Sequence, residues 1–216
     1  MNHHDAPKRE ALGIQGPAGR LEALLEYPRV AEVRRVAVIC HPHPLHQGTM
    51  QNKVVHTLAR AMLELDAVAL RFNFRGVGAS EGQHADGVGE VGDAMAACAW
   101  MRERFPGCEL LLAGFSFGAM VACATAVTVQ PAQLVTIAPP VERTRELLAG
   151  RHPAVPWLVV QGDADGVVPS AGVMAWVAGL VPPPELVVLP GVDHFFHGSL
   201  ASLRETLVGR LSAVSA

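Results

Sequence analysis

A serine between two glycines is the residue in this sequence that most clearly suggests chemistry. Ser116 lies at the centre of the segment Gly114–Gly118, which matches the pattern G-x-S-x-G. In that pattern the serine occupies a sharp turn between a strand and a helix, with its hydroxyl exposed above a sheet. Glycine has no Cβ and therefore allows so tight a turn two residues to either side. We take Ser116 as a candidate nucleophile.

The segments on either side of Ser116 are the ones that the pattern requires. Residues 110–113 form a continuous apolar run, which is typical of a strand buried on both faces of a parallel sheet. Small residues predominate after Gly118, and they favour a helix that lies close to that sheet. The chain contains 21 glycines, so the bare pattern could arise by chance. The strand and the helix around it make chance a poorer explanation.

Strands and helices alternate through the rest of the chain. Residues 9–16 and 19–27 flank a Gly-Pro-Ala-Gly turn and predict an antiparallel hairpin at one sheet edge. The other predicted strands are 34–40, 67–72, 110–113, 133–138, 156–160 and 185–189, and the predicted helices start near 52, 91, 118, 144, 171 and 198. This alternation predicts an α/β fold with a mostly parallel sheet.

Four of these strands end in residues that suggest chemistry, and in open parallel sheets ligands bind beyond the carboxyl ends of the strands. The strand at 34–40 leads into a loop with two prolines and three histidines, and the strand at 110–113 leads into Ser116. An acidic loop with Asp163 and Asp165 follows the strand at 156–160, and His194 follows the last strand. Serine, acid and histidine thus occur in the chain order of the α/β-hydrolase triad.

The sequence resembles the α/β-hydrolase superfamily over about residues 20 to 210. Within it, the chain is similar to small bacterial serine hydrolases without a lid, in which a His-Pro-His-Pro-Leu loop follows the third strand. The matching segments are 41–45, 74–82, 114–118, 162–169 and 191–194. The resemblance implies the α/β-hydrolase fold, with a mostly parallel central sheet flanked by helices. Residues 139–156, where many members insert a lid, have room for only a small helix.

The resemblance also implies a role for each candidate residue. Ser116 would attack a carbonyl carbon, and His194 would take its proton and later give it to the leaving group. The family places its acid in a Gly-x-x-Asp-x-x-Val-Pro loop, which points to Asp165 as the group that orients the imidazole. Asp163 would be the neighbour that shapes the turn.

Two residues beside His194 are alternatives that the sequence leaves open. Asp193 adjoins the histidine, and we expect its side chain to point away. His197 is a rival base, although a partly exposed residue at the start of a helix is the simpler interpretation.

An oxyanion hole needs two backbone N–H groups. One would be that of Phe117, the residue after the nucleophile. The other should come from the loop at 41–48, where Pro42 and Pro44 have no N–H to give. This leaves His43 and Leu45, and we prefer Leu45 because it falls where related hydrolases place their donor. Common members of the family have glycines where this chain has prolines, so we expect a stiffer loop.

Two further patterns suggest binding sites but have simpler explanations. The histidines at 41, 43 and 46 could bind zinc, yet prolines separate them and no carboxylate or cysteine partner is recognisable nearby. Hydrogen bonding within the loop is the simpler role. Residues 74–78 suggest a phosphate loop but lack its Lys-Ser/Thr pair. We expect a turn there, with Arg75 or Ser80 tying loops together, and we expect neither a metal nor a cofactor.

The composition excludes several classes of protein. The chain has 216 residues, of which 50% are hydrophobic and 17% charged, which predicts one globular domain over residues 9–216 after a flexible arm at 1–8. A net charge of −3 gives no basic footprint for nucleic acid or an anionic membrane. No apolar run approaches the ~18 residues of a membrane span. The four cysteines form no C-x-x-C pair and the N-terminus is polar, so we expect reduced thiols and a cytoplasmic protein.

These observations predict a carboxylesterase-type serine hydrolase that acts through an acyl-enzyme on a small or soluble acyl ester. We expect an open, shallow pocket, in which Phe117 and Phe195 could be walls. The alternatives are a thioesterase, a peptidase or another acyl transfer on the same triad, or a binding module whose triad is vestigial. The oligomeric state is not indicated.

Overall fold

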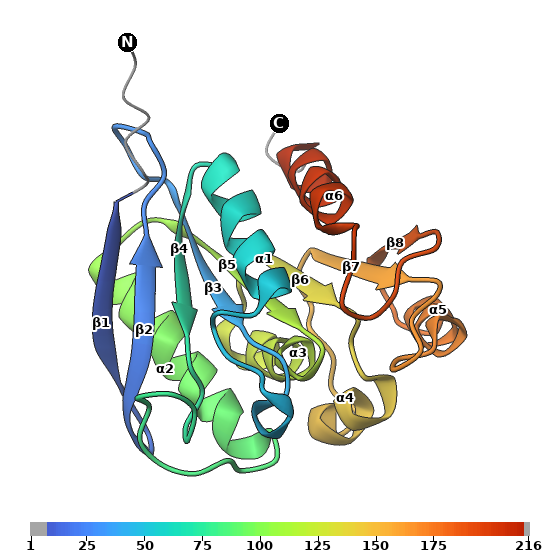
Figure 1. Ribbon diagram of the computed structural model, residues 1–216, viewed down its shortest axis with the longest axis horizontal. Helices are drawn as coiled ribbons and strands as arrows, with labels where there is room; N and C mark the ends of the chain where they lie inside the picture. Colours follow the sequence, from blue (N-terminus) through green and yellow to red (C-terminus); the bar gives the residue numbers. More distant parts are fainter. Residues whose placement is uncertain (1–7, 214–216) are drawn as a thin grey trace.

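The structure is a computed structural model that describes residues 8–213. Within that range eight strands form one sheet in the order β1-β2-β4-β3-β5-β6-β7-β8, and helices cover both of its faces (Figure 1). Most of the predicted N-terminal arm, residues 1–7, lies outside the described residues. Lys8 itself is anchored, because its carbonyl accepts the N–H of Tyr27 at 3.0 Å.

The strands confirm the predicted α/β class. The first two form the expected antiparallel hairpin, and β2 continues antiparallel onto β4, while the remaining pairs are all parallel. Their bounds are β1 Arg9–Gly16, β2 Gly19–Glu26, β3 Arg35–Cys40, β4 Ala67–Phe72, β5 Glu109–Phe115, β6 Gln133–Ile137, β7 Trp157–Gly162 and β8 Glu185–Leu189.

Six α-helices in the described part of the chain form the two outer layers. They are α1 Lys53–Glu64, α2 Val88–Arg104, α3 Phe117–Val129, α4 Val141–Leu148, α5 Ser170–Ala178 and α6 Leu200–Ala213. The first and last cover one face, and the other four cover the opposite face (Figure 1). None of these helices is both long and apolar enough to cross a membrane.

Alternation along the central strands builds the two cores. In β3, Val36, Val38 and Cys40 pack into the core beneath α2 and α3, whereas Ala37 and Ile39 pack into the core beneath α1 and α6. Successive side chains of a strand point to opposite faces, so a strand covered by helices on both sides must be apolar throughout. For this reason the central strands could be recognised in the sequence as continuous apolar segments.

Three helix starts differ from the predicted ones by two or more residues. The second helix begins at Val88 rather than 91, because the carboxylate of Glu90 accepts the N–H groups of Ala85 and Gly87 and so caps it. The fourth begins at Val141 rather than 144. The last begins at Leu200, so His197 lies in the turn before the helix and not at its start.

The segment between β6 and β7 contains only one short helix, α4. This confirms the expectation that no sizeable lid is inserted there. The loop after β4 is tied down as predicted, by both of the proposed residues. Arg75 donates three hydrogen bonds to the buried carboxylate of Asp93, and the Ser80 hydroxyl donates to Asn73 O and accepts from the N–H of Glu22.

Candidate active site

Ser116 lies at the junction of β5 and α3, in the sharp turn that the sequence predicted. Its backbone has φ 53° and ψ −119°, a region that residues with a Cβ rarely adopt. Such a conformation costs about 1–3 kcal/mol and persists only where the surroundings enforce it. Here the N–H of Ser116 donates to Ile137 O at 2.8 Å, and its carbonyl accepts the N–H of Ala119 at 2.8 Å.

The two glycines of the motif are required by close packing of backbone. A Cβ on Gly114 would overlap the carbonyl of Gly118, and a Cβ on Gly118 would overlap the carbonyl oxygens of Cys40 and His41. The first turn of α3 therefore lies directly on the end of β3. As a result, the loop that follows β3 is held beside Ser116.

The structure brings together the three residues that the sequence singled out. Nδ1 of His194 is 2.8 Å from Oδ2 of Asp165, and Nε2 is 3.1 Å from Oγ of Ser116. An ionised carboxylate can only accept, so Nδ1 carries the proton and Nε2 is left to accept from the serine hydroxyl. His194 and Asp165 are buried, whereas Ser116 is partly exposed.

The carboxylate of Asp165 is fixed by further donors. Oδ1 accepts the N–H groups of Val167 and Val168 at 2.8 and 2.7 Å, in a tight turn after β7. Asp163 makes a different contact, with its Oδ1 accepting the N–H of Gly191. It thus links the loops after β7 and β8, and the structure places Asp165 rather than Asp163 against His194.

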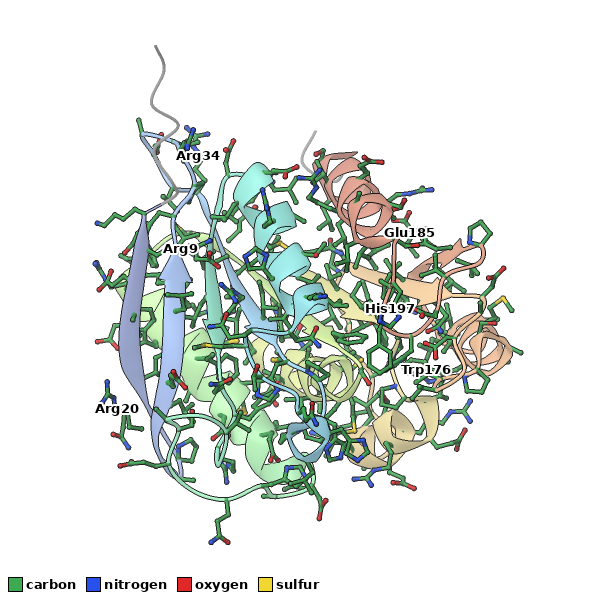
Figure 2. The ribbon with its side chains drawn as sticks, in the orientation of Figure 1. Arg9, Arg20, Arg34, Trp176, Glu185 and His197 are labelled. Carbon is green, nitrogen blue, oxygen red and sulfur yellow. The ribbon has the colours of Figure 1, made fainter. Side chains whose placement is uncertain are left out.

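Asp193 and His197 pair with each other rather than with Ser116. Nδ1 of His197, which is labelled in Figure 2, is 2.6 Å from Oδ2 of Asp193, and both side chains are substantially exposed. The side-chain hydrogen bond from His197 lowers the pKa of Asp193. The aspartate therefore points away from His194, as expected, and the rival base makes no contact with the serine.

Two of the three histidines of the loop after β3 form hydrogen bonds with their side chains, and the ring of the third, His46, stacks on that of His43. His41 is fully buried, and its Nε2 accepts the N–H of Phe74 at 3.0 Å, which leaves Nδ1 to donate to Pro42 O. Nδ1 of His43 accepts the N–H of Leu45 at 3.2 Å. Within residues 8–213, no group of three or more histidine, cysteine or acidic side chains is arranged to hold a metal ion.

The hydrogen bond between the Leu45 N–H and the His43 ring affects which residue of this loop could donate to an oxyanion. The N–H of Leu45, preferred from the sequence, is already taken by the His43 ring, and the Leu45 side chain is 71% exposed. The N–H of His43 has no acceptor among the described residues, while its carbonyl accepts the N–H groups of His46 and Gly48 at 3.0 Å. These hydrogen bonds tie the loop to itself, and the stiffness expected from its prolines stays a prediction. Phe117 is the first residue of α3, where an N–H has no partner within the helix.

The sequence profile of the X-Pro dipeptidyl-peptidase family (S15) matches residues 18–145, which is more than half of the chain. The chain belongs to this family. The match contains Ser116 but ends before Asp165 and His194, so those two residues are placed at the site by the structure itself.

Relatives of this S15-family chain agree with its fold. It is similar to an α/β serine hydrolase homologue from Coxiella burnetii, with 48% identity, a TM-score of 0.89, and coverage of 94% of this chain and 97% of the other. A serine hydrolase without a lid from Xanthomonas campestris is 41% identical, with a TM-score of 0.84 and coverage of 95% and 94%. An uncharacterised protein of Rickettsia prowazekii is 35% identical over 194 residues, 85% of this chain and 80% of that one. The S15-family chain is therefore a serine hydrolase with the α/β-hydrolase fold.

Sequence reasoning missed Gln161, the second-last residue of β7, which lies four residues before Asp165. Its side chain is fully buried, and Nε2 lies 3.0 Å from both Oδ2 of Asp165 and the carbonyl of Val168. The predicted strand stopped at Val160. A polar residue directly after that apolar run was the available signal.

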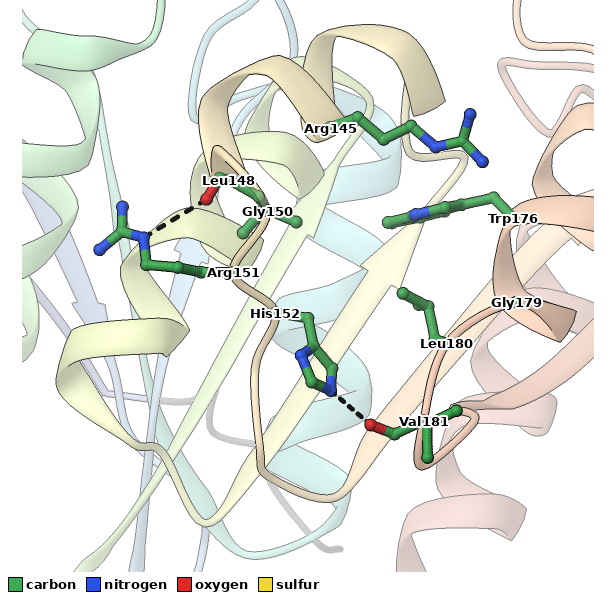
Figure 3. Close-up of a pocket in the computed structure, with 9 residues that line it drawn as sticks. All are labelled: Arg145, Leu148, Gly150, Arg151, His152, Trp176, Gly179, Leu180 and Val181. Atoms are coloured by element: carbon green, nitrogen blue, oxygen red, sulfur yellow. Dashed lines mark hydrogen bonds between the residues drawn. The ribbon is translucent and has the colours of Figure 1, made fainter.

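A separate hollow lies between α4 and α5 (Figure 3). It has a volume of about 420 Å³, with Trp176 and Leu180 on one side, Arg145 at its upper rim and His152 below, bonded to Val181 O. Neither the serine, the aspartate nor the histidine of the candidate site lines it. The hollow is therefore distinct from that site.

We predict that Gln161→Leu slows the labelling of Ser116 by a fluorophosphonate about tenfold, because a hydrogen bond to a charged carboxylate is worth about 1.5–3 kcal/mol. The measurement is the labelling rate of the purified variant. Gln133→Leu is the matched control, since Gln133 is also buried with an unpaired Oε1 but lies at the start of β6, away from Asp165. Equal rates for the two variants would contradict a positioning role for Gln161.

His41 should make the fold sensitive to acid. Burial is the main cause that lowers its pKa from 6.5 to about 4. Between these values the unfolded chain binds a proton that the folded chain does not, so stability falls as the pH falls. The free energy of unfolding should drop by about 3 kcal/mol from this group between pH 6.5 and 4. Urea unfolding across this range should show a steeper pH dependence for the wild type than for His41→Asn, and equal slopes would refute the assignment.

Proposed function

We propose that this chain is a carboxylesterase-type serine hydrolase that cleaves small or soluble acyl esters through an acyl-enzyme. Ser116 is the nucleophile, His194 the general base and acid, and Asp165 the group that orients the imidazole. One observation carries the proposal: the 2.8 and 3.1 Å contacts that join Asp165, His194 and Ser116 in a line at the carboxyl edge of the sheet. A neutral serine is a weak nucleophile and becomes reactive through such an adjacent base.

The geometry supports a two-step reaction. In the first step Oγ of Ser116 bonds to the carbonyl carbon while Nε2 of His194 takes the hydroxyl proton. The imidazolium that forms is stabilised by Asp165, and it gives the proton to the departing alcohol as the ester bond breaks. In the second step water loses a proton to Nε2 and attacks the acyl group. The acid is released, and the proton returns to Oγ.

For the oxyanion hole we propose the N–H groups of Phe117 and His43. Phe117 follows the nucleophile, and its place at the helix start leaves its N–H available. Leu45 was the other candidate in the loop, but its N–H donates to the His43 ring, whereas the N–H of His43 has no acceptor among the residues described. The packing of Gly118 on Cys40 and His41 keeps this loop beside Ser116.

The surroundings of Ser116 favour a small acyl group. The serine is partly exposed, and α4 is too short to form a lid over it. Phe195 lies edge-on against the ring of His194, with centroids 5.1 Å apart, and is half exposed. Such an apolar wall suits a short acyl chain that remains close to water.

A second candidate is a peptidase that cleaves after proline. The S15 profile over residues 18–145 is the observation that favours it. The same three side chains serve amide hydrolysis as well as ester hydrolysis. The two functions differ in the substrate and not in the catalytic residues. Kinetics on ester and amide substrates therefore distinguish them.

We predict that a fluorophosphonate labels the wild-type protein on Ser116, as mapped by mass spectrometry. Labelling should be absent in Ser116→Ala and at least about 10³-fold slower in His194→Ala, because the hydroxyl then has no base. Circular dichroism should show that both variants remain folded. A Ser116→Ala protein that hydrolyses esters at the wild-type rate would refute the mechanism. A wild type that resists labelling would favour a binding module with a vestigial triad.

Kinetics on esters and on a proline-containing amide distinguish the two candidate functions. We expect a higher kcat/KM on 4-nitrophenyl acetate and butyrate than on alanyl-prolyl-4-nitroanilide. The reverse order would replace the esterase with the proline-specific peptidase.

A further inference from the structure

A groove with a cationic lining lies between α1 and α6. The two helices are in contact and run side by side over one face of the sheet (Figure 1). The space between them has a volume of about 430 Å³. It is lined by Gln51, Lys53, His56, Thr57, Arg60, Leu200, Ala201 and Arg204. Three of these side chains are permanent cations and none is a carboxylate, although the whole chain has a net charge of −3.

Two of the three cations are unpaired. The exposed side chains of Lys53 and Arg60 form no hydrogen bond or ion pair with any residue that the structure describes. Arg204 is 2.9 Å from Glu64, whose carboxylate lies outside the groove. The lining therefore keeps a positive charge that the protein does not itself neutralise.

A buried guanidinium lies beneath the groove, and the one carboxylate that pairs with it is shared with a second arginine. Arg71 is 1% exposed and donates from Nε to Glu26 at 2.8 Å, but Glu26 also binds Arg9 at 3.0 Å. One carboxylate is thus shared by two guanidinium groups. Nη1 of Arg71 donates to Met50 O and reaches Oε1 of Gln51 at the rim of the groove. The positive field also acts on His56, whose pKa is lowered by burial first and then by Arg71.

The neighbouring cavity provides a contrast. It has a volume of about 450 Å³ and shares His56 and Arg60 with the groove. Its lining also contains Glu26, Glu64 and Asp66, so acidic groups offset its arginines. The preference for an anion therefore belongs to the space between α1 and α6 and not to the whole surface around it.

One end of the groove lies where α1 and α6 begin, close in sequence to the residues of the candidate site. The helix α1 begins directly after the loop that carries His43, and α6 begins six residues after His194. Gln51, Lys53, Leu200 and Ala201 belong to these two beginnings. A ligand bound at Ser116 with a sufficiently long arm would meet the groove at this end.

We propose that the groove binds a phosphate group on the leaving-group arm of the substrate, so that phosphorylated acyl thioesters or esters are the preferred substrate class. Two guanidinium groups and an ammonium exceed what one carboxylate would use, and they suit a phosphate with its two charges and three terminal oxygens. The proposal rests on the proposed function, because Ser116 must attack the acyl carbon. Because the acyl group is small, the long arm that reaches the groove belongs to the leaving group, on the other side of the scissile bond.

The test compares acetyl-coenzyme A with acetyl-pantetheine, a thioester that lacks the phosphates and the adenosine of coenzyme A. The wild type should show at least a tenfold higher kcat/KM on acetyl-coenzyme A, and the preference should fall as salt is added. The double variant Lys53→Gln/Arg60→Gln should lose about tenfold of this preference, through KM. It should hydrolyse acetyl-pantetheine as the wild type does. The double variant Arg34→Gln/Arg102→Gln removes the same charge from exposed positions outside the groove and should keep the preference.

Each other outcome overturns the proposal. A wild type without a preference, or a groove variant that loses both substrates equally, would show that the groove does not hold the arm. Inorganic phosphate that slows both thioesters equally would indicate a site for the free ion. If no ester or thioester is hydrolysed, the proposed function fails, and calorimetry with coenzyme A still decides on the groove. Binding to the wild type that is lost in the groove variant supports it, and absent binding refutes it.

Discussion

The contact between the first turn of α3 and the end of β3 is the constraint on which the site depends. It exists only because Gly114 and Gly118 have no Cβ, so that backbone meets backbone. The same contact forces Ser116 into its strained conformation and holds the loop after β3 against the start of the helix. Ser116, the N–H of Phe117 and the proposed oxyanion loop are therefore positioned by the same contact. The strain at the serine is offset by packing in the cores on either side of β5.

Buried side chains fix the loops at the carboxyl edge of the sheet, where the hydrogen bonds between strands end. Beyond the last paired residues, backbone N–H groups of the loops need acceptors, and leaving them unpaired would be costly. Side chains that are buried or nearly so provide them: His41 for Phe74, Asp93 for Arg75, Glu90 for Ala85 and Gly87, Asn73 for Met50, and Asp165 for Val167 and Val168. The loops at the carboxyl edge are thus fixed by polar groups, and Asp165 orients its own loop as well as His194.

The sequence sufficed for the features that depend on local patterns. Apolar runs located the strands because helices cover both faces, and chain order at the strand ends located Ser116 and His194. Features that depend on contacts between distant segments were harder to predict. From the local sequence, Gln161 is only a polar residue after an apolar strand. Its hydrogen bond to the carboxylate of Asp165 forms only when the loop after β7 folds back over the strand. The hydrogen bond from the Leu45 N–H to the His43 ring could not be predicted either, because residue spacing does not give the orientation of a ring.

A site without a lid must discriminate between substrates by other means. A lid encloses the substrate and excludes water, and α4 is too short to do so. Discrimination then depends on fixed surfaces that other parts of the substrate reach, because binding energy gained at a distance from the scissile bond can be used to orient the reacting carbonyl. The cationic groove beside α1 is such a surface, and unlike an apolar wall it acts over a distance on a charged group. The open site and the cationic groove are therefore complementary. The open site leaves the leaving-group arm of the substrate free, and the groove fixes that arm by binding its phosphate.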